Sequence, residues 1–158
     1  MPKKSEFPKF SPDGIECNAI CRNVYDGDTI YLEIDLRNIL KKYYNQERYG
    51  IIEQLPYRPV YFLCRMAGYN SAEISRSSEE EKHKGLEAKD FLSELILDKE
   101  LKVHFLASHE GELIQLTNHD PYGRPIIDLY TLEGVYVNKL MIESGHGKPY
   151  NGRGEKKY

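Results

Sequence analysis

Tryptophan is absent from this chain and cysteine is scarce, with only Cys17, Cys21 and Cys64 among 158 residues. The spacing of Cys17 and Cys21 matches neither a redox motif nor a zinc motif, and all three cysteines lie in apolar runs. We therefore expect buried free thiols, as in a reducing compartment, and no disulfide bond.

Long apolar stretches, a secretory leader and a strong excess of one charge are also missing. No run approaches the roughly 20 apolar residues of a membrane-spanning helix, and Lys3 and Lys4 are not followed by the apolar region of a signal peptide. The sequence thus predicts an intracellular chain, or one already processed, without membrane contact. The net charge of -3 argues against binding nucleic acid by bulk charge, but it permits positive charge concentrated at one phosphate.

Metal and nucleotide motifs built on histidine or glycine are likewise absent. The five histidines form no H-x-H or H-E-x-x-H pattern and no cluster with cysteine, so a zinc site is not expected. No P-loop and no G-x-G-x-x-G sequence occurs. What remains, with 40% hydrophobic and 30% charged residues, is the composition of a single globular domain with a substantial core.

The order of apolar patterns predicts a small α+β barrel. Strands are expected at 17–25, 29–36, 60–67, 101–107 and 125–131, and helices at 84–97 and 137–143. Ser77 and Ser78 each precede a glutamate by three residues, a capping-box pattern that would start the first helix earlier, whereas Gly85 favours the later start. Outside the domain at 15–150, we expect a flexible arm at 1–14 and a basic tail at 151–158.

Residues 37–58 form an insertion between the second and third expected strands. Ile39, Leu40 and Tyr43 fall on one side of a helix-like segment, so we expect them to pack against the barrel with the basic residues pointing outward. Those outward residues are Lys41, Lys42 and Arg48. The mixture of positive charge and tyrosine also suits a groove for single-stranded nucleic acid or a protein interface, and both alternatives stay open.

Three short motifs gather the polar side chains that a phosphodiester and a divalent cation require. They are Asp26-Gly27-Asp28-Thr29 at an expected hairpin tip, Arg65 to Glu73 at the end of the third strand, and Asp120 to Arg124. A carboxylate at a hairpin tip presents oxygen to a hard cation such as calcium, and a guanidinium engages two phosphate oxygens. Each motif also has an ordinary interpretation: a common Asp-Gly turn, a structural salt bridge in the strand, or a surface arginine in a turn.

In this order, the three motifs resemble those of the staphylococcal nuclease (thermonuclease) family, whose pattern is DGDT, then R-x-x-x-x-D-T-P-E, then D-x-Y-G-R. The resemblance spans about Cys17 to Tyr150. It implies an OB-fold, a five-stranded β-barrel with two to three helices, here with the 37–58 insertion between strands 2 and 3. It further implies a calcium-dependent nuclease that cuts single-stranded or frayed DNA and RNA with low sequence preference and leaves 3′-phosphate ends.

The resemblance also implies a role for each site residue. Asp28, Asn70 and the backbone carbonyl of Ser71 would hold calcium (Ca2+), supported by Asp26 and Thr29. Asn70 departs from the family aspartate, which removes one negative charge, and Ala72 departs from proline. Glu73 would be the general base, and Arg65 and Arg124 would bind the phosphate. Three residues would contact the nucleotide: Tyr122, Lys148 and Tyr150.

The main alternative is an OB-fold module that binds nucleic acid or a protein without catalysis. Some relatives keep the barrel and lose the acids, whereas this chain keeps Asp28, Arg65, Glu73 and Arg124 together. That combination favours the enzyme. A monomer is the expected state, although the sequence leaves the oligomeric state open.

Overall fold

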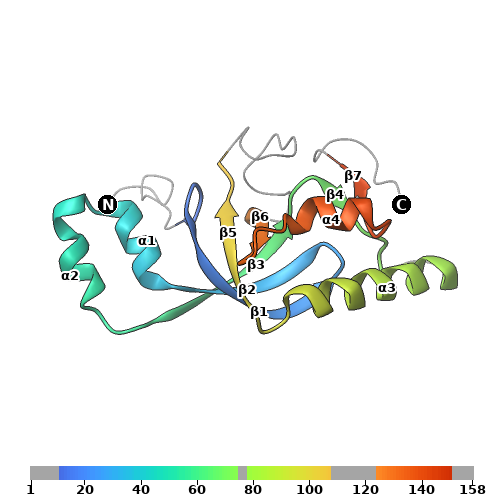
Figure 1. Ribbon diagram of the computed structural model, residues 1–158, viewed down its shortest axis with the longest axis horizontal. Coiled ribbons are helices and arrows are strands. Elements are labelled where there is room, and N and C mark those ends of the chain that lie inside the picture. The colour runs from blue at the N-terminus through green and yellow to red at the C-terminus, as the bar shows by residue number, and fades with distance from the viewer. Residues whose placement is uncertain (1–10, 75–77, 108–123, 151–158) are drawn as a thin grey trace, which may run out of the picture.

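Five strands form one sheet that closes on itself, in the order β1-β2-β3-β6-β5 (Figure 1). The computed structural model describes residues 11–74, 78–107 and 124–150. The elements in this sheet are β1 (Glu16–Asp26), β2 (Thr29–Asp35), β3 (Pro59–Met66), β5 (Glu100–Phe105) and β6 (Ile126–Thr131). All five expected strands are therefore present within one or two residues, and the α+β class is confirmed.

Antiparallel pairing dominates the closed sheet, with one parallel junction. β1 pairs with both β2 and β5, whereas β3 and β6 run parallel where Arg65 lies opposite Ile126. A separate two-stranded sheet joins β4 (Tyr69–Asn70) to β7 (Lys148–Pro149), which the sequence did not predict. This small sheet holds the chain after β3 against the chain after the last helix.

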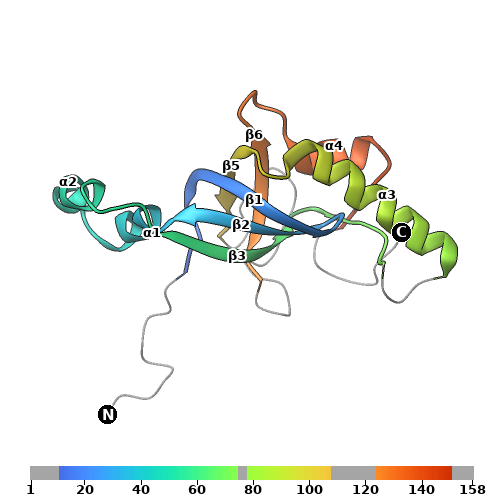
Figure 2. The same cartoon turned by 90° about the horizontal axis from the view of Figure 1, so that it is seen from below.

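The core fills the closed sheet and the space under two helices, α3 (Glu79–Ile96) and α4 (Val137–Glu143). In β2, Ile30, Leu32 and Ile34 are almost fully buried, as the alternating pattern predicted. The helices contribute Ala88, Leu92 and Ile96 from α3, and Val137 and Met141 from α4. Figures 1 and 2 show α3 and α4 at the same end of the sheet.

The start of α3 corrects one expectation. The helix begins at Glu79, where the Ser78 hydroxyl accepts a hydrogen bond from the Glu81 N–H at 3.3 Å, so the capping pattern was the correct signal. Gly85 lies inside the helix and does not start it. A Cβ at Gly85 would lie 2.8 Å from the Ala72 carbonyl oxygen. The glycine therefore allows α3 to approach the chain at residues 72–74.

The inserted segment folds into more pieces than expected. It contains α1 (Leu36–Tyr43), a 3-10 turn η2 (Gln46–Arg48) and α2 (Tyr49–Glu53), which makes four α-helices in the described residues instead of two or three. Gly50 lies inside α2. Figures 1 and 2 show α1 and α2 beyond the end of the sheet opposite α3.

The packing expected of the insertion holds for one residue only. Ile39 is 1% exposed and joins the main core, whereas Leu40 is half-buried and Tyr43 is 40% exposed. Lys41 is not simply directed outward, because its Nζ lies 2.9 Å from the Glu53 carboxylate and so joins α1 to α2. The Lys42 Nζ donates to the Ser11 carbonyl oxygen at 2.9 Å. Two of the three basic side chains, Lys41 and Lys42, therefore make contacts within the fold.

The cysteines are free thiols, as expected, although only Cys21 and Cys64 are buried and Cys17 is half-buried. Burial raises the pKa of Cys17 and of Cys21 to about 12. Both thiols are therefore protonated at neutral pH and unreactive.

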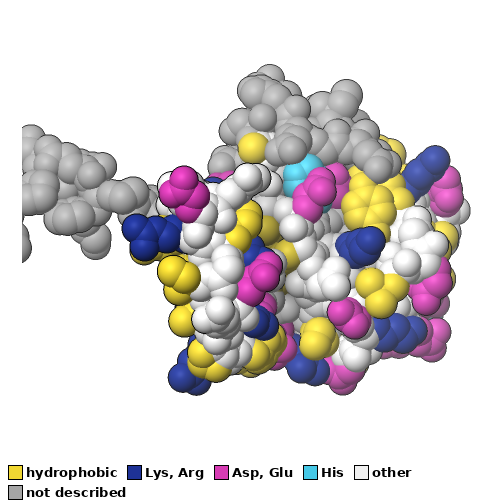
Figure 3. Space-filling model, turned by 60° about the vertical axis from the view of Figure 1, so that its left-hand side comes forward, with side chains coloured by type: hydrophobic (Ala, Val, Ile, Leu, Met, Phe, Trp, Pro, Cys, Tyr) yellow, Lys and Arg dark blue, Asp and Glu magenta, His cyan; other side chains and the backbone are white. Residues whose placement is uncertain are grey.

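The surface mixes charges of both signs. On the face shown in Figure 3, acidic and basic side chains of the described residues are interspersed with apolar ones. This distribution agrees with a net charge of -3, so any binding of an anion depends on local clusters of positive charge. None of the helices in the described residues has the length and apolar character to cross a membrane.

Candidate functional site

The site begins at the hairpin tip between β1 and β2. Asp26 ends β1, Thr29 begins β2, and the Asp28 N–H donates to the Asp26 Oδ1 at 3.0 Å, which closes the turn. Gly27 packs into this corner: a Cβ there would lie 2.7 Å from the Cβ atoms of Ala88 and Ser71. The tip is therefore fixed between α3 and the chain after β4.

We expect Gly27→Ala to destabilise the fold by about 1–3 kcal/mol, because the added methyl group overpacks this corner. The matched control is Gly50→Ala in α2, where nothing lies within 4 Å of the new Cβ. There the change should stabilise by up to about 1 kcal/mol through helix propensity. Chemical denaturation of both variants measures the difference. Equal stabilities would mean that the tip is loosely packed.

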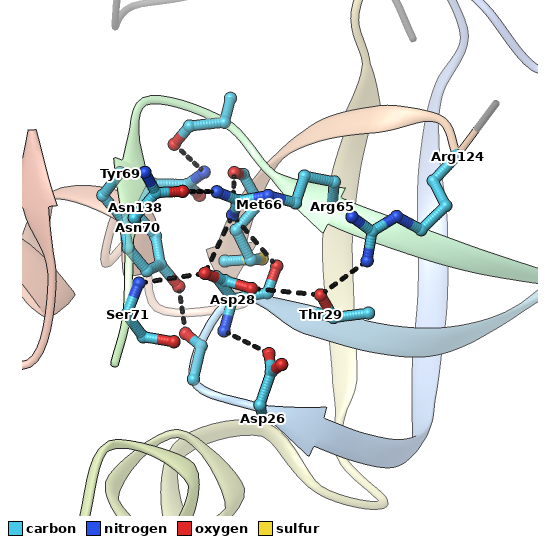
Figure 4. Close-up of polar contacts among 12 residues, drawn as sticks. Asp26, Asp28, Thr29, Arg65, Met66, Tyr69, Asn70, Ser71, Arg124 and Asn138 are labelled. Carbon is cyan, nitrogen blue, oxygen red and sulfur yellow. Dashed lines mark hydrogen bonds and ion pairs between the residues drawn. The ribbon is translucent and has the colours of Figure 1, made fainter. Parts of the chain in front are cut away.

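Arg65 is the centre of the polar cluster. It lies opposite Thr29 in the register between β2 and β3, and its Nη1 is 3.3 Å from the Asp28 Oδ2. The same nitrogen donates to the backbone carbonyl oxygens of Met66 at 3.2 Å and Asp28 at 3.4 Å. Its Nη2 donates to the Asn70 Oδ1. The guanidinium thus lies between a carboxylate oxygen and an amide oxygen (Figure 4).

The Asp28 carboxylate has partners on both oxygens besides Arg65. The Thr29 hydroxyl donates to Oδ1 at 3.0 Å, and the Ser71 N–H donates to Oδ2 at 2.9 Å. Burial raises the pKa of Asp28, but the charge of Arg65 and these hydrogen bonds outweigh it and hold the pKa below its ordinary value. Asp28 is therefore ionised at neutral pH although it is only 8% exposed.

Arg124 reaches this cluster through Thr29. Its Nη1 donates to the Thr29 Oγ1 at 3.0 Å, across 95 residues of sequence (Figure 4). Thr29 therefore touches both Asp28 and Arg124, which is the supporting place expected for it. The two arginines that the sequence singled out lie at the same end of the sheet.

Asn70 and Ser71 are also part of the cluster, and both are buried. Asn70 is 1% exposed and Ser71 is 3% exposed. The guanidinium donates to the Asn70 Oδ1, so the orientation of the amide is fixed by chemistry. Within the described residues, neither the Asn70 Nδ2 nor the Ser71 Oγ has a hydrogen-bond partner.

The other expected site residues lie nearby or outside the described part. Glu73 is half-buried, and its backbone passes Gly85 of α3. Lys148 is exposed and pairs with Asn70 through the β4–β7 ladder, and the Tyr150 N–H donates to the Gly68 carbonyl oxygen at 2.9 Å. Tyr122 lies outside the described residues. The structure thus gathers the proposed metal ligands and arginines, with Lys148 next to Asn70.

The donor set fits a hard cation. The Asp28 Oδ2 and the Asn70 Oδ1 already face a positive group, the guanidinium of Arg65, and Ser71, whose backbone carbonyl is the expected third ligand, follows Asn70 in the chain. Carboxylate oxygens, side-chain amide oxygens and backbone carbonyl oxygens are calcium ligands. Within the described residues, no three His, Cys, Asp or Glu side chains gather as a metal cluster.

Two supporting residues were missed by the sequence analysis. The Tyr69 hydroxyl donates to the Gly27 carbonyl oxygen at 2.7 Å, which ties β4 to the hairpin tip. The Asn138 Nδ2 donates to the carbonyl oxygens of Ala67 and Ile127 at 3.0 Å, and joins α4 to β6 and to the residue that follows β3. Nothing local in the sequence marks either contact, because both depend on partners far along the chain.

The buried carboxyl of Asp26 is expected to make the free energy of unfolding depend on pH when no divalent cation is present. Burial and then the charge of Asp28 raise the pKa of Asp26 to about 7 from an ordinary 3.8. Between these values the folded chain binds more protons than the unfolded chain, so the free energy of unfolding falls as the pH rises.

We therefore expect Asp26→Asn to raise the melting temperature at pH 8 relative to wild type, and to change it less at pH 5, where wild-type Asp26 is largely protonated. Thermal unfolding with chelator at both pH values measures this. A variant equally shifted at pH 5 and pH 8 would contradict the titration of Asp26 in this range.

Comparison with known proteins adds no assignment, because no protein-family model and no curated protein matches this chain. The functional argument therefore rests on the sequence motifs and on the geometry of this cluster.

Proposed function

We propose that this chain is a calcium-dependent phosphodiesterase of the staphylococcal nuclease type, on an OB-fold, that hydrolyses single-stranded or frayed DNA and RNA and leaves 3′-phosphate ends. One observation carries the proposal. Asp28, Arg65, Asn70 and Ser71 form one buried polar cluster at an end of the closed sheet, with Arg124 bonded to it through Thr29.

The roles are those that the resemblance to the nuclease family implies, and each is within the chemistry of its group. Arg65 and Arg124 would neutralise the oxygens of the scissile phosphate, as planar donors with parallel N–H groups. Glu73 would take a proton from the attacking water while the water oxygen forms a bond to phosphorus. The bond between phosphorus and the 5′ oxygen would break, and a solvent water would give the leaving oxygen its proton. Calcium, when bound by Asp28, Asn70 and Ser71, would add positive charge next to the phosphate oxygens.

Arg65 has two partners in this scheme at different times. Without substrate it neutralises Asp28 and bonds to Asn70. If Asp28 and Asn70 held a calcium ion, its charge would neutralise Asp28 and the guanidinium of Arg65 would be available to a phosphate. The proposal therefore requires Arg65 to exchange Asp28 for substrate.

The first test is calcium-stimulated cleavage. We expect purified protein to degrade labelled single-stranded DNA with calcium up to about the millimolar range of weak calcium sites, and to lose this activity with chelator. The end groups of the products, with 3′-phosphate expected, identify the bond that breaks. Intact DNA and RNA across the titration, with folded protein, would refute the enzyme.

The alternative is a non-catalytic OB module, and one observation favours it. Asn70 supplies no negative charge, and its Oδ1 is already bonded to Arg65. If the cluster is a structural salt bridge, the protein will bind oligonucleotides or a protein partner equally with and without calcium. Binding without calcium dependence and without cleavage separates this function from the enzyme.

A further inference from the structure

A pocket adjoins the cluster through Asn70. It has a volume of about 340 Å³ and lies between α3, the end of α4 and β7. We call it the α3–β7 pocket. The residues that matter here are Asn70, Lys84, Glu87, His146, Gly147 and Lys148.

The charge of the pocket walls is predominantly positive. Lys84 and Lys148 line it, and the one acidic side chain, Glu87, has its Oε1 3.0 Å from the His83 Nε2. Lys84 is 3.5 Å from Glu80 one turn away, but both side chains are exposed and such pairs contribute little. Both lysines are therefore able to turn toward an anion.

A buried donor at the boundary completes the pattern. Arg65 fixes the Asn70 Oδ1 on its own side, so Nδ2 lies on the opposite edge of the amide, and it has no partner in the described chain. A buried donor without a partner costs about 1–3 kcal/mol. Asn70 lines the pocket but is only 1% exposed, so an acceptor oxygen bound there would satisfy Nδ2 after a local shift of the atoms that cover it. An aspartate at this position could not donate.

The backbone keeps these groups together. Asn70 and Lys148 are paired residues in the β4–β7 ladder. At Gly147 a Cβ would collide with the ring of Tyr69, so the chain here lies directly against β4. The His146 ring packs on Phe91 of α3 with centroids 4.5 Å apart. The backbone of Lys148 is thus held opposite Asn70 by packing as well as by hydrogen bonds.

We propose that the α3–β7 pocket binds a phosphate group through the Asn70 Nδ2, Lys84 and Lys148, and that this is the phosphate next to the scissile one in a bound strand. The source of the phosphate rests on the proposed function. Inorganic phosphate and free nucleotides offer the same chemistry, so the experiment has separate arms for them.

The first arm needs neither metal nor catalysis. Inorganic phosphate is titrated into the full isotope-labelled chain with chelator, and the side-chain amide of Asn70 and the backbone amide of Lys148 are followed by NMR. We expect a saturable shift that weakens about tenfold in Lys84→Glu/Lys148→Glu. Lys82→Glu/Lys139→Glu has the same net charge outside the pocket, and should behave as wild type. No saturable shift, or the same affinity in both double variants, overturns the pocket.

The second arm tests the strand. With chelator, the slope of log affinity for single-stranded DNA against log salt should be shallower by about 0.7 in Lys84→Glu/Lys148→Glu, corresponding to one phosphate contact. If the wild-type protein shows the phosphate shift but the salt slope is the same in wild type and in the double variant, the bound phosphate does not belong to the nucleic acid. Free phosphate would then be the ligand of the pocket. If the protein cleaves DNA but shows no saturable phosphate shift, only the phosphate-binding inference is refuted. If it shows the saturable phosphate shift but never cleaves DNA, only the proposed enzyme activity is refuted.

Asn70→Asp gives a third readout with opposite signs. The carboxylate adds charge at the cation site, so calcium affinity measured by calorimetry should rise. The same change removes the donor, so the phosphate shift at Lys148 should weaken. If the affinities for calcium and for phosphate change in the same direction, Asn70 does not contribute to both the cation site and the pocket.

Discussion

Replacing Glu73 with glutamine is expected to lower the turnover of single-stranded DNA by about 10²–10⁴-fold at saturating calcium, which is the contribution of a positioned base. The melting temperature should change little, because Glu73 is half-buried and lies outside the hydrophobic core. Initial rates and thermal unfolding on the same preparation measure both quantities.

Two comparisons make this result specific. Arg124→Ala should lower turnover by about 10²–10³-fold, as expected for a lost donor to the phosphate. Glu79→Gln, at an exposed position in the first turn of α3, is the matched control and should leave turnover unchanged. If Glu73→Gln keeps normal turnover per folded molecule, Glu73 is not the general base and is an ordinary loop glutamate.

Arg65→Met is expected to have the largest effect on stability, a loss of about 3–5 kcal/mol, because it leaves the carboxylate of Asp28 buried without its opposite charge. Asp28 is 8% exposed and Arg65 is 7% exposed, so water replaces little of the lost interaction. For a domain of this size the melting temperature should fall by roughly 10 °C in chelator. Activity should be lost as well, since the guanidinium also serves the phosphate.

Two matched measurements separate the structural and functional parts of this loss. Asp28→Asn/Arg65→Met removes both charges and should recover much of the stability. Calcium should raise the melting temperature of Arg65→Met more than that of wild type, because it would replace the guanidinium between Asp28 and Asn70. An equal calcium shift in both proteins would show that the cation does not bind there.

Local pattern predicted most elements of the fold. The alternation of Ile30, Leu32 and Ile34 located β2, and the predicted helix at 137–143 matches α4. Errors arose where a residue has a tertiary role. Gly85 looked like the start of a helix, but it is the point where α3 passes the Ala72 carbonyl.

The insertion shows the same limit. Its apolar side predicted a helix, yet the break between α1 and α2 and the 40% exposure of Tyr43 depend on where the segment leaves the sheet. Periodicity reports which side of a helix is apolar and says nothing about which surface covers it.

The sequence by itself determined the order of the strands along the chain, the free thiols, and the identity of the acids and arginines in the motifs, because these depend on residue type and short spacing. Only the tertiary structure decided that Arg65 lies between Asp28 and Asn70, that Arg124 reaches Thr29 from 95 residues away, and that the Asn70 Nδ2 has no hydrogen-bond partner among the residues that the structure describes. Closure of the sheet brings distant segments into contact and excludes water from them. Charge pairing and unsatisfied donors acquire their energetic weight only in that buried setting.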